Sequence, residues 1–137
     1  MRICGIDLKA NNTIFSVVDT TEDDDIAVYI DMKTKKITLG DDESQDAIRS
    51  YCNDLLVFLT QNSIDKIVIK KRSKKGAFAG GAVTFKMEAW LQLNPHCVVE
   101  LISSARISSY QKKNCIEFPE ELNKYQEQAY LAAVIGA

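Results

Sequence analysis

A basic, glycine-rich segment in the second half of the chain carries the residue types that bind phosphate. The members of this segment are Lys66, Lys70, Lys71, Arg72, Lys74 and Lys75, followed by Gly76, Gly80 and Gly81. Glycines let a backbone approach a ligand closely, and a helix starting near Ala82 would add exposed N–H groups and a positive dipole. Basic side chains combined with backbone amides form a site for phosphate or a nucleic-acid backbone.

Two other interpretations of this segment stay open. The segment could instead be a solvated lysine run that closes a strand. Phe78 would either stack on a base or anchor the loop in the core. The residue order does not match the G-x-x-x-x-G-K-[ST] pattern, so a nucleotide-binding P-loop is excluded.

Asp7 is the second residue that could take part in chemistry, because it is a charged residue within an otherwise apolar strand centre. A buried carboxylate costs free energy unless another group satisfies it. Asp7 therefore either serves a functional site or lies partly exposed beside the turn at Asn11 and Asn12.

The remaining reactive residues exclude several classes of protein. His96 is the only histidine, so a histidine-rich metal site and a Ser-His-Asp triad with a spare histidine are improbable. The cysteines form no CxxC or zinc-like spacing and are expected to be buried, reduced thiols: Cys4, Cys52, Cys97 and Cys115. No window approaches the roughly 18–20 apolar residues that cross a bilayer, and no secretory leader is evident. We therefore expect a cytoplasmic protein with no membrane partner.

Composition and charge agree with one globular domain. The chain has 137 residues, of which 46% are hydrophobic and 26% are charged. Its net charge of −2 conceals an asymmetry: residues 1–65 contain 6 basic and 13 acidic side chains, and residues 66–137 contain 11 basic and 6 acidic ones. Such a split either marks a nucleic-acid-binding face or is accidental.

Hydrophobic periodicity predicts the elements that position these residues. The expected strands span residues 2–9, 13–19, 26–32, 65–71 and 97–102, and residues 36–39 extend or follow the third strand. The expected helices span residues 44–61, 82–93, 104–112 and 119–134, the last beginning at Pro119.

This order predicts an α/β fold. The first three strands are hairpinned and must be antiparallel, whereas strands joined through helices are most simply parallel. We therefore expect a mixed five-stranded sheet, three antiparallel strands followed by αβαβα, with helices on both faces and a single domain over residues 1–137.

The predicted order is that of the ribonuclease-H-like fold, and two stretches resemble known families. MRICGIDLKANN at residues 1–12 resembles the first strand of RuvC-type Holliday junction resolvases, where Gly-Ile-Asp opens the domain. KGAFAGGAVTFKMEAWLQL at residues 75–93 and YQEQA at residues 125–129 resemble a bacterial domain family of unknown function with the same resolvase-like fold.

The resemblance implies a position for a metal site. Resolvases bind two divalent ions, about 3.5–4 Å apart, through carboxylates from the first strand, the end of the fourth strand and the last helix. Asp7 matches the first position and Glu127 is the candidate for the last. Lys70 or Lys71 stands where the fourth-strand acid belongs, and we expect a lysine there to pair with Asp7.

Other acids are weaker candidates for that site. Glu88 on the second helix, and Glu120 and Glu121 before Glu127, are expected to be solvent-exposed or to join the carboxylates. Lys124 is an alternative partner of Glu127 at helical spacing.

Three functions are consistent with these residues and with the resemblance. The leading hypothesis is a resolvase-like, nucleic-acid-associated protein that binds DNA or RNA and has an incomplete two-metal site. The alternatives are an active Mg²⁺- or Mn²⁺-dependent endonuclease that uses Asp7 and Glu127, and a non-catalytic interaction module. The resemblance also implies a homodimer, to which Trp90 could contribute.

Overall fold

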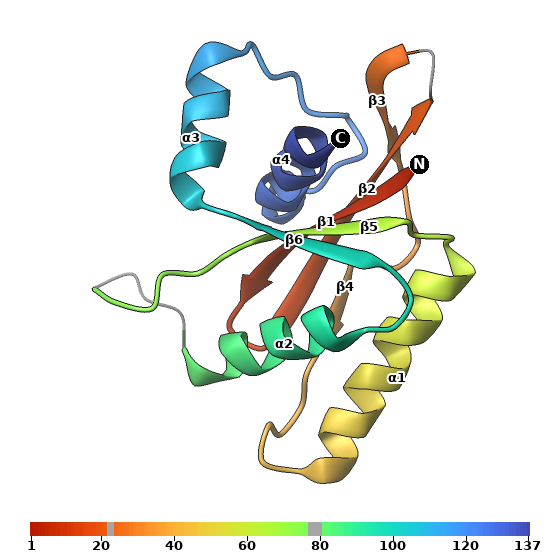
Figure 1. The fold of residues 1–137 in the computed structure, drawn as a ribbon, viewed down its shortest axis with the longest axis vertical. Helices are drawn as coiled ribbons and strands as arrows, with labels where there is room; N and C mark the ends of the chain where they lie inside the picture. The colour runs from red at the N-terminus through yellow and green to blue at the C-terminus, as the bar shows by residue number, and fades with distance from the viewer. Residues whose placement is uncertain (22–23, 77–80) are drawn as a thin grey trace.

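The structure is a computed structural model that describes residues 1–21, 24–76 and 81–137 (Figure 1). Its strands are β1 (Arg2–Lys9), β2 (Asn12–Thr21), β3 (Asp24–Ile30), β4 (Lys36–Thr38), β5 (Lys66–Lys70) and β6 (Val98–Ile102). Its helices are α1 (Gln45–Gln61), α2 (Ala82–Leu93), α3 (Ser104–Lys113), the 3₁₀ turn η1 (Lys124–Gln126) and α4 (Glu127–Gly136).

The strands form one mixed sheet in the order β3-β2-β1-β5-β6. β2 pairs antiparallel with β1 and β3, whereas β5 pairs parallel with β1 and β6, as the sequence predicts. Over the described residues the sheet has six strands rather than the five expected. β2 is long enough for two partners on one edge: β3 pairs with its second half, and the short β4 pairs with residues Asn12 to Ile14.

Helices cover both faces of this sheet. In Figure 1, α1 and α2 lie on one side of the strands and α3 and α4 on the other. The alternation of side chains along β1 follows this division, because Cys4, Ile6 and Leu8 join the larger core with α1 and α2. Ile3 joins the smaller core with α3 and α4, so Asp7, two positions after Gly5, also faces α4.

A glycine sets the distance between β1 and α4. A Cβ atom at Gly5 would overlap the carbonyl oxygen of Ala129 and lie 2.7 Å from the amide nitrogen of Ala133. The α4 backbone therefore rests directly on β1, and the alanines on this helix face are fully buried. This contact brings the first turn of α4 beside the C-terminal end of β1.

The last helix begins later than its proline suggests. Pro119 opens a turn, in which Leu122 N donates to Pro119 O at 3.1 Å, and the regular helix starts only at Glu127. The start is fixed by Asn123, whose backbone N–H donates to the Oε1 atom of Gln126 at 3.0 Å in a capping box. The prediction of a helix from residue 119 was therefore wrong by two turns.

All four cysteines are free, but one prediction about them was wrong. Cys4 and Cys52 are buried and Cys97 is half-buried, whereas Cys115 is exposed. Burial, followed by the charge of Asp65, raises the pKa of Cys97 to about 11, so this thiol stays protonated and unreactive near neutral pH. Within the residues that the structure describes, none of the helices is both long and apolar enough to span a membrane.

Candidate functional site

Asp7 lies at the floor of a cleft beside α4. Its side chain is only 2% exposed, and its Oδ1 atom has no hydrogen-bond partner among the described residues. The cleft has a volume of about 580 Å³ and is lined by Asp7, Lys9, Asn123, Lys124, Tyr125, Glu127 and Gln128. The structure therefore brings Asp7 and Glu127 to one cleft, as the sequence-based hypothesis requires.

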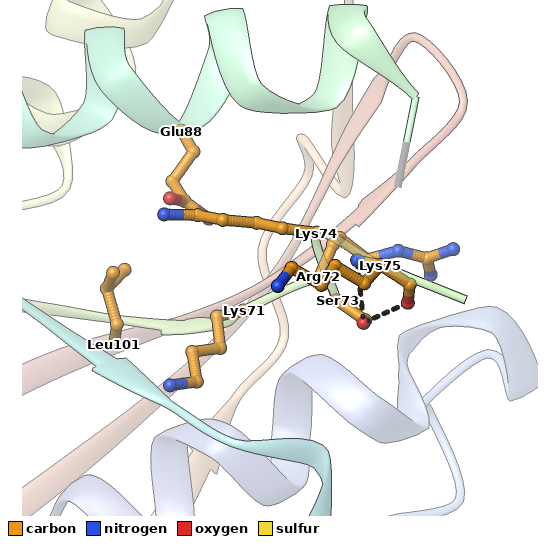
Figure 2. A pocket seen from close by; sticks show the side chains of 7 residues that line it. All are labelled: Lys71, Arg72, Ser73, Lys74, Lys75, Glu88 and Leu101. Carbon is orange, nitrogen blue, oxygen red and sulfur yellow. Dashed lines mark hydrogen bonds between the residues drawn. The ribbon is translucent and has the colours of Figure 1, made fainter. Parts of the chain in front are cut away.

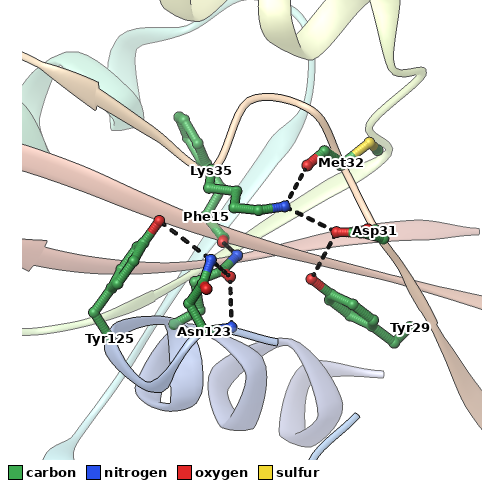
Figure 3. A network of polar contacts seen from close by, with 8 residues as sticks. Phe15, Tyr29, Asp31, Met32, Lys35, Asn123 and Tyr125 are labelled. Atoms are coloured by element: carbon green, nitrogen blue, oxygen red, sulfur yellow. Dashed lines mark hydrogen bonds and ion pairs between the residues drawn. The ribbon is translucent and has the colours of Figure 1, made fainter. Parts of the chain in front are cut away.

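Gln126 holds the start of α4 against the sheet. This side chain is 2% exposed, and its Nε2 atom donates to the carbonyl oxygen of Phe15 on β2 at 2.9 Å. Figure 3 shows Phe15 between Asn123 and Tyr125 on one side and Lys35 on the other. The Oε1 atom of Gln126 accepts from Asn123, so one buried amide fixes the wall of the Asp7 cleft.

A polar cluster next to this wall orders the β3–β4 connection. Lys35 Nζ donates to Asp31 Oδ1 and to the Met32 carbonyl, each at 2.9 Å (Figure 3). The hydrogen bond from its ammonium to Asp31 raises the pKa of Lys35. Lys36, the next residue, places its ammonium 5.6 Å from the ring centroid of Tyr125, which is 39% exposed at the cleft.

Lys70 occupies the position beside Asp7 but does not pair with it. The two residues are register partners on the parallel strands β1 and β5. Lys70 Nζ instead donates to Gln128 Oε1 on α4 at 2.9 Å. None of the ion pairs found in residues 1–21, 24–76 and 81–137 includes Asp7. The expected lysine–Asp7 pair is therefore replaced by a lysine–amide hydrogen bond.

Four cations of the basic segment lie at a second cleft. This cleft has a volume of about 480 Å³ and is lined by Lys71, Arg72, Ser73, Lys74, Lys75, Glu88 and Leu101 (Figure 2). Leu101 packs with the larger core, which places this cleft on the α2 side of the sheet. Consecutive lysines therefore take different places: Lys70 contacts Gln128, which lines the Asp7 cleft, whereas Lys71 lines the second cleft.

Local hydrogen bonds shape the loop of this second cleft. Ser73 Oγ donates to the Lys75 carbonyl at 2.6 Å and accepts from the Lys75 N–H at 3.2 Å. Lys71 N donates to the carbonyl of Ile102 at 2.9 Å, so the segment leaves the sheet only after Lys71. Four basic residues line the cleft around this loop: Lys71, Arg72, Lys74 and Lys75.

Glu88 extends from α2 into the second cleft (Figure 2). It is half-buried, and its Oε2 atom is buried without a hydrogen-bond partner among the described residues. Glu88 therefore neither joins Asp7 nor lies fully in solvent, and both sequence-based interpretations of this residue were wrong.

The other predicted site residues are divided between the two clefts and the surface. Gly81 is an exposed residue that precedes α2, and its carbonyl oxygen accepts from Thr84 N at 3.1 Å. Gly80 and Phe78 lie outside the described residues. Glu120 and Glu121 are exposed and line neither cleft.

Sequence reasoning missed several lining residues. Lys9, Asn123 and Tyr125 reach the Asp7 cleft because the 3₁₀ turn folds back over the end of β1. The Asn-x-x-Gln spacing of Asn123 and Gln126 is a capping-box signal, and it could have placed that turn.

The donors of the Asp7 cleft do not fit a two-metal centre. Two divalent ions need several converging carboxylates, but only Asp7 and Glu127 supply carboxylates to this cleft. Lys70 is the register partner of Asp7, and its ammonium contacts Gln128 on α4. This positive charge would repel a cation bound at Asp7. Across the described part of the chain, no group of three His, Cys, Asp or Glu side chains is placed to hold a metal ion.

The arrangement of strands and helices is shared with known resolvases. RuvC of Thermus thermophilus superimposes with a TM-score of 0.67 at 12% identity, covering 98% of this chain and 92% of that one. The same protein in complex with a Holliday junction substrate gives a TM-score of 0.69 at 12% identity, covering 98% and 90%. A fowlpox virus resolvase with Holliday junction DNA gives 0.56 at 14% identity, covering 99% and 93%.

These similarities define the class of fold: the chain has a RuvC-like, ribonuclease-H-like fold. The sequence defines the family. Residues 1–136 match the model described as "Protein of unknown function (DUF3010)", and the chain belongs to this family. No significant match is found among curated proteins. Both the fold and the family predicted from the sequence are confirmed.

Proposed function

We propose that this protein is a resolvase-like, nucleic-acid-associated protein that binds a phosphate backbone at the cleft of Lys71, Arg72, Lys74 and Lys75. The observation that carries the proposal is this gathering of four cations at one cleft, at the end of the central parallel strands. Ligands of open α/β sheets bind outside the carboxyl ends of the strands. Similarity of fold to two resolvases that are seen with Holliday junction DNA supports a nucleic acid as the ligand.

Counterion release explains why this cleft would bind a polymer of phosphates more tightly than a single small anion. Each phosphate that a Lys or Arg neutralises releases condensed counterions, so a row of cations gains affinity from a polymer of phosphates. Three of the four cations belong to one short stretch, residues 71–74, which suits successive phosphates of one strand. The contact is with the backbone, so this cleft supplies affinity without reading sequence.

We expect replacement of Lys71, Lys74 and Lys75 by alanine to weaken binding of a four-way junction about 10- to 100-fold at low salt. The slope of log affinity against log salt should fall by about two to three, because three phosphate contacts are lost. A matched control replaces Lys33, Lys112 and Lys113, three exposed lysines that line neither cleft. Fluorescence anisotropy at several salt concentrations measures both quantities. Equal weakening by the two triple variants, or no binding by the native protein at low salt, would contradict the proposal.

The second candidate function is a metal-dependent endonuclease, favoured by the convergence of Asp7 and Glu127 on one cleft. The presence of only two carboxylates in this cleft, with the ammonium of Lys70 beside them, argues against this function. We expect no cleavage of a Holliday junction in Mg²⁺ or Mn²⁺ above that of a sample in EDTA. Cleavage that the Asp7→Asn variant abolishes would establish the endonuclease instead.

A further inference from the structure

The cleft of the four cations contains one acid that its proposed role does not explain. A carboxylate repels phosphate, so Glu88 weakens a purely phosphate-binding cleft. Glu88 nevertheless extends into the cleft from the middle of α2, and the side chain is half-buried (Figure 2). Its presence there calls for a ligand group other than phosphate.

Ion pairing with a neighbouring lysine does not explain why Glu88 lies in this cleft. No ion pair within residues 1–21, 24–76 and 81–137 includes Glu88. The cations that do pair with acids are the N-terminal amine, Arg2, Lys35, Lys66, Lys86 and Arg106. Among the described residues, no group donates a hydrogen bond to the buried Oε2 atom of Glu88. The buried Oε2 is out of a ligand's reach, so a ligand in the cleft would donate to the other carboxylate oxygen of Glu88. That hydrogen bond would offset part of the cost of holding a half-buried carboxylate.

We infer that Glu88 accepts a hydrogen bond from a ribose 2′-hydroxyl and that this cleft prefers RNA to DNA. The inference rests on the proposed function, because the neighbouring cations must hold the phosphates. In a polynucleotide the 2′-hydroxyl is a donor that lies close to the phosphate, so a carboxylate among cations is suited to bind a ribonucleotide. The 2′-hydroxyl is also the group that lets a protein distinguish RNA from DNA.

The dimensions of the cleft agree with this assignment. A volume of about 480 Å³ lies within the usual range of roughly 300–1,000 Å³ for small-ligand clefts. Leu101 adds an apolar side chain to a lining that otherwise consists of four cations, Ser73 and Glu88. One nucleotide unit has the same distribution, with a charged phosphate, a hydroxylated sugar and an apolar face.

The test compares a uridine dodecamer with the deoxyuridine dodecamer of the same length. These strands differ only at the 2′ position, and uracil has no exocyclic amino group that could bind Glu88 instead. We expect the native protein to bind the RNA about tenfold more tightly, the gain typical of one hydrogen bond to a charged group. The Glu88→Ala variant should bind both strands equally, with its affinity for DNA unchanged or higher.

Two further variants and a stability measurement complete the test. Glu88→Gln keeps an acceptor oxygen and should retain part of the preference. Glu120→Ala removes an exposed acid that lines neither cleft and should retain all of it. Thermal unfolding verifies that each variant is folded, and Glu88→Met, which has a similar length and no acceptor oxygen, replaces Glu88→Ala as the decisive variant if the alanine variant is not.

The outcomes separate the inference from the proposed function. Equal affinity of the native protein for the two strands would overturn the inference alone, and so would a full preference that persists in the folded variant without an acceptor at position 88. Failure of either strand to bind at low salt would overturn the proposed function together with the inference.

Discussion

The Gly5→Ala variant is expected to lose about 3 kcal/mol or more of its free energy of unfolding, at the upper end of overpacking effects. The added methyl group would overlap the Ala129 carbonyl and lie 2.7 Å from the Ala133 amide nitrogen. Both neighbours are backbone atoms of α4, which cannot rotate away as a side chain can. The helix must therefore move off β1, and the smaller core opens with it.

Urea denaturation measures this loss, with Gly40→Ala as the matched control. A Cβ atom at Gly40 would meet only the Cβ of Ala47 at 3.8 Å, an ordinary van der Waals distance. The control variant should therefore unfold near the native midpoint. Equal midpoints for the Gly5 and Gly40 variants would show that the contact between β1 and α4 is not tight.

The second expected result concerns the metal-binding capacity of the Asp7 cleft. The Lys70→Glu variant should bind Mn²⁺ at this cleft, whereas the native protein should not. Lys70 is the register partner of Asp7, and its ammonium reaches Gln128 on α4, the helix that also carries Glu127. A glutamate at position 70 would therefore add a third carboxylate to Asp7 and Glu127 and remove the repelling charge.

Thermal unfolding in EDTA and in 1 mM Mn²⁺ tests this expectation. Without metal the variant should be less stable than the native protein, because three carboxylates then repel one another. If the dissociation constant is on the order of 10 µM, Mn²⁺ at 1 mM would restore about 2.7 kcal/mol. The Lys70→Gln variant removes the cation without adding a carboxylate and should respond weakly. An equal response of the two variants to Mn²⁺ would refute the assignment of Lys70 as the group that excludes the ion.

The fold and the approximate place of every strand follow from local patterns in the sequence. Alternation in residues 2–9 and 13–19, the asparagine turn between them, and the apolar centre of residues 66–70 are local signals, and strand pairing follows from them. The late start of α4 was missed because Pro119 and the acids after it also suit a helix N-terminus. Pairing of the Asn123 and Gln126 side chains favoured a turn there instead.

Which residues share a cleft follows only from the tertiary structure. Sequence reasoning grouped Lys70 with Lys71 because they are neighbours along the chain. It considered Glu88 only as a solvent-exposed acid or as a partner of the Asp7 carboxylate. The two faces of the sheet separate them: Lys70 reaches Gln128 beside Asp7, and Lys71 shares the other cleft with Glu88. Side-chain alternation along β5 is a local property, but which helix covers each face depends on packing between elements far apart in sequence.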